Sequence, residues 1–473
     1  MRLLSFAVGV AMFAVCASCD SGAQGPSSCT SSTRPSVVNG GPVGASQEPS
    51  ACVRAVQQSS ASTQKLGTHT VGDVVTFSVP PGTASITIFS QGAGAIADTV
   101  NFRGTTIGNT VVPTLLKDPN GNVVYDDSAN SSADPSGQTG FYGSDSVSTG
   151  AMTLPNTSRL AHQVASQGGL TPGTWQFVVN DFAFECLSTS GCSGGSNAGR
   201  YDIQILTKFG VGAANGTVDV RLYLVGGSLT ASSAPTDPAL SRMVQTLAQL
   251  YSGAGLCLGS VTAYDVPGWA RTRFGSGVSA DDTSPCSDLD QMFTLSGSKN
   301  ELNLFLVNDL VANQQNGAMV VGVDGTIPGP SALGGTIHSG AAVSLADLSI
   351  NRCGNAIDFL NCGADEVAYI AAHESGHWMG LYHTTELSGD SFDPIADTPT
   401  CECTRCAPSS EQASCAANDP NGGSPTTMST AWCTAGSSCG GGENLMFWVL
   451  GSGSKGTFSS DQGQVVRANP VVR

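Results

Sequence analysis

The stretch from His373 to His383 reads His-Glu-Ser-Gly-His-Trp-Met-Gly-Leu-Tyr-His. In a helix, His373 and His377 lie one turn apart on one face, so both imidazoles can reach a single metal ion. Gly380 can adopt the left-handed conformation that ends a helix, and His383 then supplies a third nitrogen. Three ligands leave the fourth position of a tetrahedral zinc ion open, as a catalytic site requires. Glu374 follows the first ligand and is placed to act as a general base.

Histidine is scarce in this chain, which makes the pattern informative. Only six histidines occur among 473 residues, and three of them fall in this stretch. The alternative, a helix whose histidines are merely solvated or hydrogen-bonded, is therefore disfavoured. We expect Asp365 to cap this helix at its N-terminus, and Val367, Ile370 and Ala371 to form its buried face.

The pattern resembles that of the metzincin zinc metallopeptidases, and the resemblance covers roughly residues 217–470. It implies an α/β zincin-type catalytic domain, which we assign to residues 217–473. It also implies a Zn2+ ion held by the three histidines, and hydrolysis of peptide bonds by a zinc-bound water that Glu374 activates. The family has a methionine turn below the metal, and Met446 is the best match, although an ordinary core methionine is the alternative.

Within this clan the nearest resemblance is to the pappalysin-like group. Thr384 directly follows the third histidine, Asp397-Thr398-Pro399 lies downstream, and residues 458–462 (Phe-Ser-Ser-Asp-Gln) resemble that group's closing helix. The group often has a tyrosine two residues after the methionine, which helps to stabilise the transition state. Trp448 stands there in this chain and cannot act identically. The stretch between Asp390 and Asp397 is also longer than the group's pattern.

Two further features near the motif have alternative interpretations. Asp390, Asp393 and Asp397 are candidates for a Ca2+ ion, because related peptidases bind calcium near this loop, but three loop aspartates can equally be solvated. His338 could lie on the edge strand that binds extended substrate in metzincins. We favour a surface histidine at this position, because nothing in the sequence fixes its place.

Upstream of the motif domain, residues 61–212 are typical of a β-sandwich. Short strand-like runs alternate with turn signals, and we find no convincing helix. Asn120-Gly121 between apolar runs indicates a tight hairpin turn. Trp175, Phe177 and Val179 alternate, as do three apolar residues in 201–205. The layout resembles the jelly-roll accessory domains of secreted bacterial peptidases.

The periodicity changes after about residue 216. Residues 218–224 predict a strand, and Thr236 or Asp237 can cap a helix that ends near Gly253. The apolar residues of that helix recur at helical spacing: Leu240, Met243, Val244, Leu247, Leu250 and Tyr251. Further strands are expected at 260–266 and 302–307. Strands and helices in this order indicate a mixed α/β domain.

The N-terminus predicts export. Residues 1–19 have the features of a bacterial lipoprotein-type signal peptide, with Cys19 as the lipidated residue. Cleavage after Ala23, which would give a freely secreted protein, is the alternative. Residues 20–60 are rich in Ser, Gly and Pro, and we expect a tether or a short pro-segment. Cys29 or Cys52 could cap the zinc before activation, but we favour disulfides for both.

Removal of Cys16 and Cys19 leaves fourteen cysteines, an even number that suits a full set of disulfides in an exported chain. Cys401, Cys403 and Cys406 are spaced like a metal cluster, and we favour disulfides there for the same reason. No later stretch is apolar and long enough to cross a membrane as a helix.

Composition excludes some partners. The net charge is −17, with 19 basic and 36 acidic residues, so we expect no nucleic-acid binding and membrane attachment only through the lipid anchor. The predicted partner is a protein or peptide substrate, cleaved by an exported zinc endopeptidase. The alternative is a surface adhesion or glycan-binding protein whose peptidase domain is inert or secondary; the intact three histidines and Glu374 disfavour it.

Overall fold

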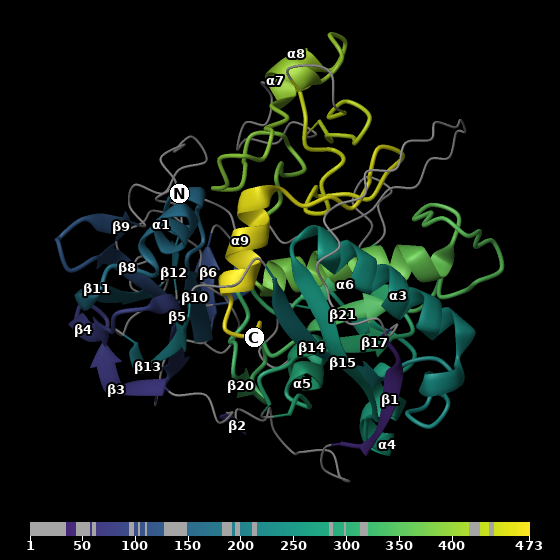
Figure 1. Ribbon diagram of the computed structural model, residues 1–473, viewed down its shortest axis with the longest axis horizontal. Helices are drawn as coiled ribbons and strands as arrows, with labels where there is room; N and C mark the ends of the chain where they lie inside the picture. Colours follow the sequence, from purple (N-terminus) through teal and green to yellow (C-terminus); the bar gives the residue numbers. More distant parts are fainter. Residues whose placement is uncertain are drawn as a thin grey trace.

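Figure 1 shows the computed structural model of the chain. It describes residues 35–43, 57–58, 63–93, 99–102, 105–108, 111–126, 149–181, 192–193, 199–210, 215–282, 287–297, 299–312, 320–415, 426–434 and 439–473. The expected signal peptide, Cys19, Cys29 and Cys52 lie outside these ranges. Within them, no helix combines the length and the apolar character that a membrane span needs.

The first region, residues 63–210, holds two four-stranded antiparallel sheets. One sheet has the order β10 (Thr149–Leu154), β5 (Thr83–Gly92), β13 (Arg200–Phe209), β3 (Thr63–Thr70). The other has the order β4 (Val74–Val79), β11 (Gly173–Asp181), β8 (Val111–Lys117), β9 (Val123–Tyr125). We call this the β-rich region.

Alternation along the strands places one apolar core between the two sheets. In β4, Val75, Phe77 and Val79 are buried while the residues between them are exposed. Trp175 and Phe177 of β11 pack into the same core as Ile203 and Ile205 of β13. The expected sandwich arrangement of two packed sheets is thus present in this region. Gly121, in the expected hairpin turn between β8 and β9, has φ +83°.

The expectation that this region lacks a helix is wrong. Helix α1 (Ser158–Gln167) begins after the N-cap Thr157, whose hydroxyl accepts a hydrogen bond from the Leu160 amide at 3.3 Å. It ends at Gly168, which has φ +78°. Its buried side chains form a narrow face on an otherwise polar helix of ten residues, so the apolar periodicity was too weak to identify it.

The second region is built on a six-stranded sheet, and we call it the α/β region. The strand order is β1 (Val37–Pro42), β15 (Leu256–Asp265), β14 (Gly216–Leu224), β17 (Leu302–Val307), β21 (Ala341–Ser344), β19 (Gly322–Asp324). Neighbouring strands are parallel except β19, which runs antiparallel to β21. The sheet therefore has an antiparallel edge strand at β19.

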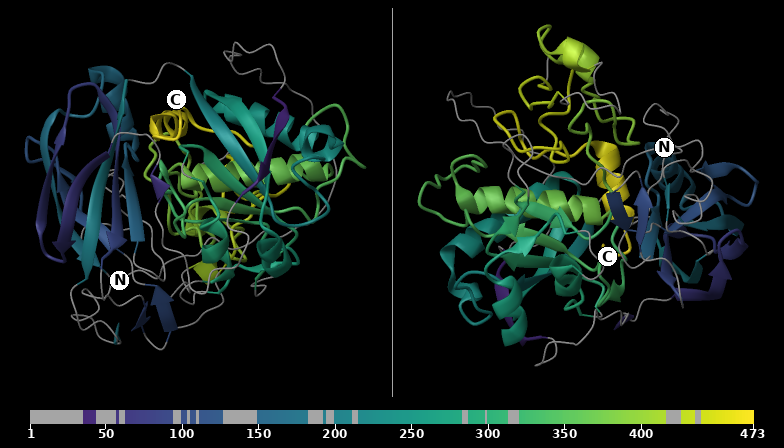
Figure 2. Two further views of the ribbon diagram at one scale, coloured as in Figure 1. Left: turned by 90° about the horizontal axis from the view of Figure 1, so that it is seen from below. Right: turned by 180° about the vertical axis from the view of Figure 1, so that it is seen from behind.

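Helices cover both faces of this sheet, as Figures 1 and 2 show. Leu222 of β14 packs into the core that α3 (Pro238–Gly253) and α6 (Gly363–Trp378) share. The next residue, Tyr223, packs on the opposite face with α4 (Gly268–Phe274) and α5 (Asp288–Phe293). The mixed α/β organisation that the sequence predicted is present here.

The capping and boundaries of α3 agree with expectation. The Asp237 carboxylate accepts a hydrogen bond from the Leu240 amide at 2.8 Å, and the helix ends at Gly253. All six apolar residues predicted for its inner face are buried. The observed strands β14, β15 and β17 lie where strands were predicted, although β15 begins four residues earlier.

Part of the expected tether is structured. Strand β1 runs parallel to β15 at the far edge of the six-stranded sheet, and β2 (Gln57–Gln58) pairs with β20 (Leu333–Gly334). The parallel pairing of β1 with β15 joins segments that are more than 200 residues apart in the sequence. Composition alone could not reveal it, because a Ser-, Gly- and Pro-rich context hides a six-residue strand.

Helix α9 (Ser460–Ala468) lies between the two regions (Figures 1 and 2). It packs against α1, and His162 of α1 contacts Asp461 of α9 at 2.8 Å. Lys208, near the end of β13, donates hydrogen bonds to the carbonyl oxygens of Arg467 and Asn469 at 2.5 and 3.1 Å. The β-rich region is thus docked on the C-terminal helix of the α/β region.

The remaining elements are short. They are η2 (Ala234–Thr236), β6 (Thr99–Phe102), β7 (Thr105–Gly108), β12 (Cys192–Ser193), β16 (Val278–Ser279), β18 (Leu310–Val311), α7 (Cys403–Cys406) and α8 (Gln412–Cys415).

Candidate metal centre

Helix α6 and the turn that follows it bring three imidazoles together. His373 and His377 lie one turn apart on α6, and Gly380, with φ +108°, turns the chain so that His383 faces them. The three Nε2 atoms are 3.1 to 3.3 Å apart. Zinc bonds of about 2.0–2.1 Å in a tetrahedral arrangement separate ligand nitrogens by about 3.3 Å. The histidine geometry therefore fits a zinc-sized ion.

A separate acceptor holds each imidazole by its other nitrogen. The Nδ1 atoms of His373 and His377 donate to the carbonyl oxygens of Leu445 and Leu381, both at 2.7 Å. The Nδ1 atom of His383 contacts Glu386 Oε2 at 3.0 Å. These contacts put the protons on Nδ1 and leave the Nε2 lone pairs directed at one another, which is the tautomer that a metal ligand needs.

Burial keeps the imidazoles of His373 and His377 neutral. It lowers the pKa of His373 to about 3, with a further decrease from His383, while the Leu445 carbonyl opposes the shift. Burial likewise lowers the pKa of His377 well below its ordinary value. Three nitrogens with converging lone pairs can hold a divalent cation. Among the residues that the structure describes, this is the one group of three or more His, Cys, Asp or Glu side chains placed to share a metal ion.

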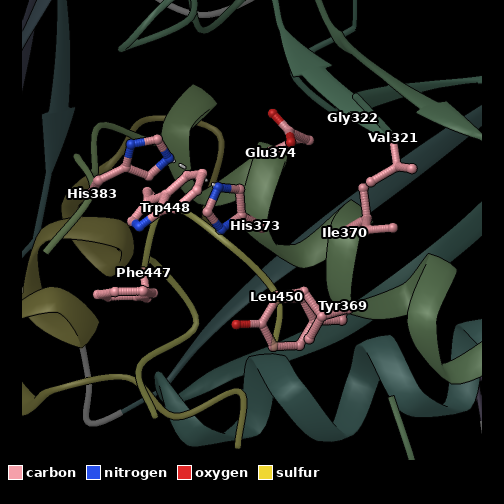
Figure 3. Close-up of a pocket in the computed structure, with 10 residues that line it drawn as sticks. All are labelled: Val321, Gly322, Tyr369, Ile370, His373, Glu374, His383, Phe447, Trp448 and Leu450. Carbon is pink, nitrogen blue, oxygen red and sulfur yellow. Dashed lines mark hydrogen bonds between the residues drawn. The ribbon is translucent and has the colours of Figure 1, made fainter. Parts of the chain in front are cut away.

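Glu374 lies beside the histidines with its carboxylate buried (Figure 3). The backbone amide of Asp324 on edge strand β19 donates a hydrogen bond to it, and Oε2 has no hydrogen-bond partner. Burial raises the pKa of Glu374 well above its ordinary value, the Asp324 charge adds to this, and the Asp324 amide opposes it. A buried carboxylate with an available oxygen can accept a proton from a water held at the centre.

The close approach of β19 to Glu374 depends on a glycine. A Cβ atom at Gly322 would lie 2.4 Å from Glu374 Oε1 and 2.6 Å from Ile370 Cγ2. Any larger residue would push the edge strand away from α6. The glycine therefore sets the distance between the strand and the carboxylate.

Met446 lies under the helix that carries the histidines. A Cβ atom at Gly376 would come within 2.5 Å of its sulfur atom. The Met446 amide donates to Asn444 Oδ1 at 2.8 Å, and its carbonyl accepts from the Thr384 amide at 2.9 Å. Asn444 in turn donates to Gln462 of α9 at 2.8 Å. The turn is thus fastened both to the third histidine's loop and to α9.

Trp448 is not available to donate a hydrogen bond to a transition state. Its indole N–H donates to the Met428 carbonyl at 2.8 Å, and the ring lines the pocket beside the histidines (Figure 3). The only donor of this side chain is therefore already used.

Asp365 does not cap α6, contrary to expectation. The N-cap residue is Cys362, and Asp365 lies within the first turn with its side chain fully buried. Arg242 of α3 donates to it at 2.7 and 2.8 Å, and Thr246 donates at 2.5 Å. Its carboxylate therefore ties α3 to α6 across the core. A partner 123 residues away overrode the local capping preference.

The cysteines expected to form disulfides rather than a metal cluster do so. The bridges are Cys353–Cys362, Cys401–Cys433, Cys403–Cys415 and Cys406–Cys439. The last three cross-link one segment, and their sulfur atoms pack with Phe447, Trp448 and Val449 into a small core. We call residues 401–439 the cysteine-rich segment. It supports the wall of the pocket at Trp448.

The three aspartates considered as calcium ligands are not among the described side chains that are grouped to share one metal ion. Asp390 is exposed and accepts a hydrogen bond from Ser388. Asp393 accepts from Thr398 at 2.5 Å, and Asp397 accepts from the Asp461 amide at 3.1 Å. Asp393 Oδ2 is buried without a hydrogen-bond partner.

His338 is buried, so the expectation of a surface histidine is wrong. Its Nδ1 donates to the Gly325 carbonyl at 2.6 Å, and its own carbonyl accepts from the Trp378 indole at 3.1 Å. It precedes β21 and is not part of edge strand β19. Small neighbours such as Gly340 hid this burial from the sequence pattern.

Two residues of the site escaped the sequence analysis. Glu386 lies three positions after the last histidine, and an acid so close to a ligand was a signal that could have indicated it. Asp324 is about fifty residues upstream of Glu374, and no spacing rule connects the two. Burial raises the pKa of the Asp324 carboxyl to about 6, although a backbone hydrogen bond opposes this.

Comparisons with known proteins add little to this geometry. No protein-family model and no curated protein matches the chain. Two solved structures are weakly similar: family two carbohydrate esterases from Clostridium thermocellum and Cellvibrio japonicus, each 10% identical with a TM-score of 0.12. The matches cover 52% and 53% of this chain, and 65% and 67% of the esterases, so the chain spans just under two thirds of the first.

Proposed function

We propose that the chain is a zinc-dependent endopeptidase of the metzincin type, nearest to the pappalysin-like group. One observation carries the proposal. His373, His377 and His383 converge through their Nε2 atoms while each Nδ1 has its own acceptor, and Glu374 lies beside them with a buried oxygen free of partners. Structural zinc sites usually have four protein ligands, whereas three ligands with an adjacent carboxylate are typical of hydrolytic sites.

The chain's own residues divide the work of amide hydrolysis. Bound zinc would supply Lewis acidity, which polarises a peptide carbonyl and makes water more acidic. Glu374 accepts the proton of the attacking water and returns it to the leaving amine. The Asp324 amide holds the carboxylate in place, and the carbonyl acceptors of His373 and His377 fix the ring orientations.

Casein hydrolysis tests the proposal directly. The purified full chain should contain close to one zinc ion per molecule and should cleave casein. A chelator should abolish cleavage, and added zinc should restore it. Cleavage that persists after complete zinc removal, or a zinc-loaded protein that cleaves no protein or peptide, would contradict the proposal.

We propose in addition that the protein is exported. The disulfides between residues 353 and 439 support this, because such bridges form and persist in oxidising compartments. A lipid anchor on Cys19 remains part of this proposal, with free secretion as the alternative. Mass spectrometry of the mature N-terminus, which would carry a diacylglyceryl group on Cys19 or start after Ala23, distinguishes the two.

A further inference from the structure

The third histidine, unlike the other two, lies outside α6. His383 follows the end of that helix, and its Nδ1 atom contacts Glu386 Oε2 at 3.0 Å. We call residues 384–391 the third-ligand loop. These residues, all of which the structure describes, form no helix or strand. Contacts with other parts of the chain must therefore hold Glu386 beside the imidazole.

The cysteine-rich segment supplies such contacts on both sides of Glu386. The residue before it, Thr385, is fully buried, and its hydroxyl accepts a hydrogen bond from the Cys401 amide at 3.1 Å. The residue after it, Leu387, accepts one at its carbonyl oxygen from the Met428 amide at 2.9 Å. The backbone on each side of Glu386 is thus bonded to the segment, which leaves the glutamate little freedom to move away from the histidine.

The segment also packs closely against the next turn of the loop. Gly389, with φ +67°, accepts a hydrogen bond from the Cys403 amide at 2.9 Å. A Cβ atom at this glycine would lie 2.8 Å from Met428 Cγ. The Met428 carbonyl accepts the indole N–H of Trp448 at 2.8 Å. One residue of the segment therefore joins the third-ligand loop to the wall of the pocket.

Disulfides do more than regular structure to fix this segment. Its described residues include two helices of only four residues each, α7 and α8. Cys401 and Cys403, whose amides hold the loop, are bridged to Cys433 and Cys415. Such bridges restrict the conformations open to a chain. Without them, a segment with so little regular structure would hold those amides against the loop for only part of the time.

We propose that the disulfides of the cysteine-rich segment complete the metal centre by holding Glu386 beside His383, so that full zinc affinity requires the oxidised chain. The inference rests on the proposed function, because it takes the three histidines to hold zinc. Each bridge forms when two thiol sulfurs join and pass two protons and two electrons to a disulfide oxidant, which becomes two thiols. A chain whose cysteines are reduced binds zinc weakly, and the centre is completed where disulfides form.

The test uses the full chain with serine in place of paired cysteines, because free thiols would themselves bind zinc. Competition with a chromogenic chelator measures zinc affinity. The pair Cys401→Ser and Cys433→Ser should bind zinc at least about tenfold more weakly than the parent chain. The control pair, Cys353→Ser and Cys362→Ser, opens the bridge at the N-terminal end of α6 and should change the affinity by less than about twofold.

A double-mutant cycle distinguishes positioning of the histidine's partner from general loosening. If the Cys401–Cys433 bridge acts through Glu386, opening it in a Glu386→Ala background should weaken zinc binding by less than about twofold more, whereas independent effects would multiply. Thr385→Val provides a second variant in case the serine pair does not fold. It keeps every bridge, removes the acceptor of the Cys401 amide and should weaken zinc binding at least about threefold. Thr434→Val, whose hydroxyl bonds within the segment, is its control and should not change the affinity.

Unchanged zinc affinity in the folded serine pair would overturn the inference, and Thr385→Val decides in the same way where that pair does not fold. An equal loss in the control pair, or full multiplication with the effect of Glu386→Ala, would overturn it as well. A parent chain that cleaves casein with zinc while the variants keep their affinity overturns this inference and leaves the peptidase proposal standing. Bridge-dependent zinc binding in a chain that cleaves no peptide overturns the peptidase proposal and leaves this inference standing.

Discussion

The interior of the β-rich region and the interior of the α/β region hold different kinds of side chain. Between the two sheets of the β-rich region, Phe77, Trp175 and Phe177 pack among aliphatic residues. The α/β region instead buries groups whose pKa values are displaced, among them Asp324 and Glu374. The first interior contributes stability, and the second holds desolvated groups near the candidate metal centre, where displaced pKa values are typical of functional sites.

The α/β region compensates for its buried charges by pairing and cross-linking. Asp365, fully buried, is paired with Arg242, whose hydrogen bonds together with that of Thr246 hold the pKa of this carboxyl below its ordinary value. Four disulfides lie between residues 353 and 439. The α/β region thus has buried polar atoms without partners at the candidate site, and disulfides and an ion pair cross-link the segments around that site.

The sharpest test of this contrast is Glu374→Ala. Because Glu374 is the proposed base, we expect turnover of casein to fall by about 10²–10⁴-fold. The zinc content should not change, since the carboxylate is not one of the three ligands. Atomic absorption and a fluorogenic peptide assay measure the two quantities. Full activity in this variant would refute the assigned role of Glu374.

In the β-rich region we expect Trp175→Ala to lower stability without changing zinc binding. Loss of a fully buried indole should lower the free energy of unfolding of this region by about 3–5 kcal/mol, because a cavity replaces packed contacts. Zinc affinity of the folded protein should stay the same. Chemical denaturation and zinc competition titrations check both parts. A loss of zinc affinity at temperatures where the variant remains folded would show that the two interiors are coupled.

A smaller effect is expected from Glu386→Ala, which removes the acceptor of His383 Nδ1. Freed of this contact, the imidazole can rotate or change tautomer, so zinc affinity should fall by about 10- to 100-fold. Glu402→Ala, at an exposed residue of the cysteine-rich segment, is the control and should leave affinity unchanged. Unaltered affinity in Glu386→Ala would show that this contact does not support the metal centre.

Asp393→Asn should change how stability depends on pH. Burial raises the pKa of the Asp393 carboxyl to about 8, while hydrogen bonds from Thr398 and Ile395 oppose this. The folded protein then keeps a proton between about pH 4 and 8 that the unfolded chain releases. The free energy of unfolding therefore falls as pH rises through this window, by up to about 1.4 kcal/mol per pH unit.

The asparagine variant should lose this slope and should be more stable than the parent chain near pH 8. Denaturation curves at several pH values measure it, with Asp390→Asn, at an exposed position, as the control. The same variants test whether Asp393 binds calcium, as the sequence suggested. Calcium that stabilises the parent chain at pH 8 but not Asp393→Asn would support a calcium site at Asp393, whereas equal effects on both would contradict one.

Local patterns predicted much of the fold and the metal centre, and failed where distant segments meet. The spacing of His373, His377 and His383 was readable because it reflects one helix turn followed by one glycine turn. Asp365 was misassigned because its partner, Arg242, comes from another helix. His338 was misplaced for a similar reason: it lies in the interior, where its carbonyl accepts a hydrogen bond from Trp378, forty residues away.

The same limit explains strand β1 and Asp324. The pairing of β1 with β15 is a parallel contact across the sequence, and its Gly-rich composition resembles that of a linker. Asp324 donates to Glu374 through its backbone amide, which every residue except proline would supply, so no side-chain pattern could indicate this contact. Residues whose role comes from the backbone or from a distant partner require the structure.

The smallest effect is expected where the two regions touch. His162 of α1 is 61% exposed and contacts Asp461 at the start of α9. The next residue, Gln462, accepts a hydrogen bond from Asn444, and Asn444 accepts one from the Met446 amide. A contact whose histidine is this exposed contributes about 0–1 kcal/mol, and Gln464 still contacts Asp461 at 3.3 Å when the histidine is gone. His162→Ala should therefore lower stability by less than about 1 kcal/mol and zinc affinity by less than twofold, with Arg159→Ala on the same helix as the control. A tenfold loss of zinc affinity in His162→Ala alone would mean that the β-rich region positions the metal centre through α9, and the division between a packing interior and a chemical interior would no longer hold.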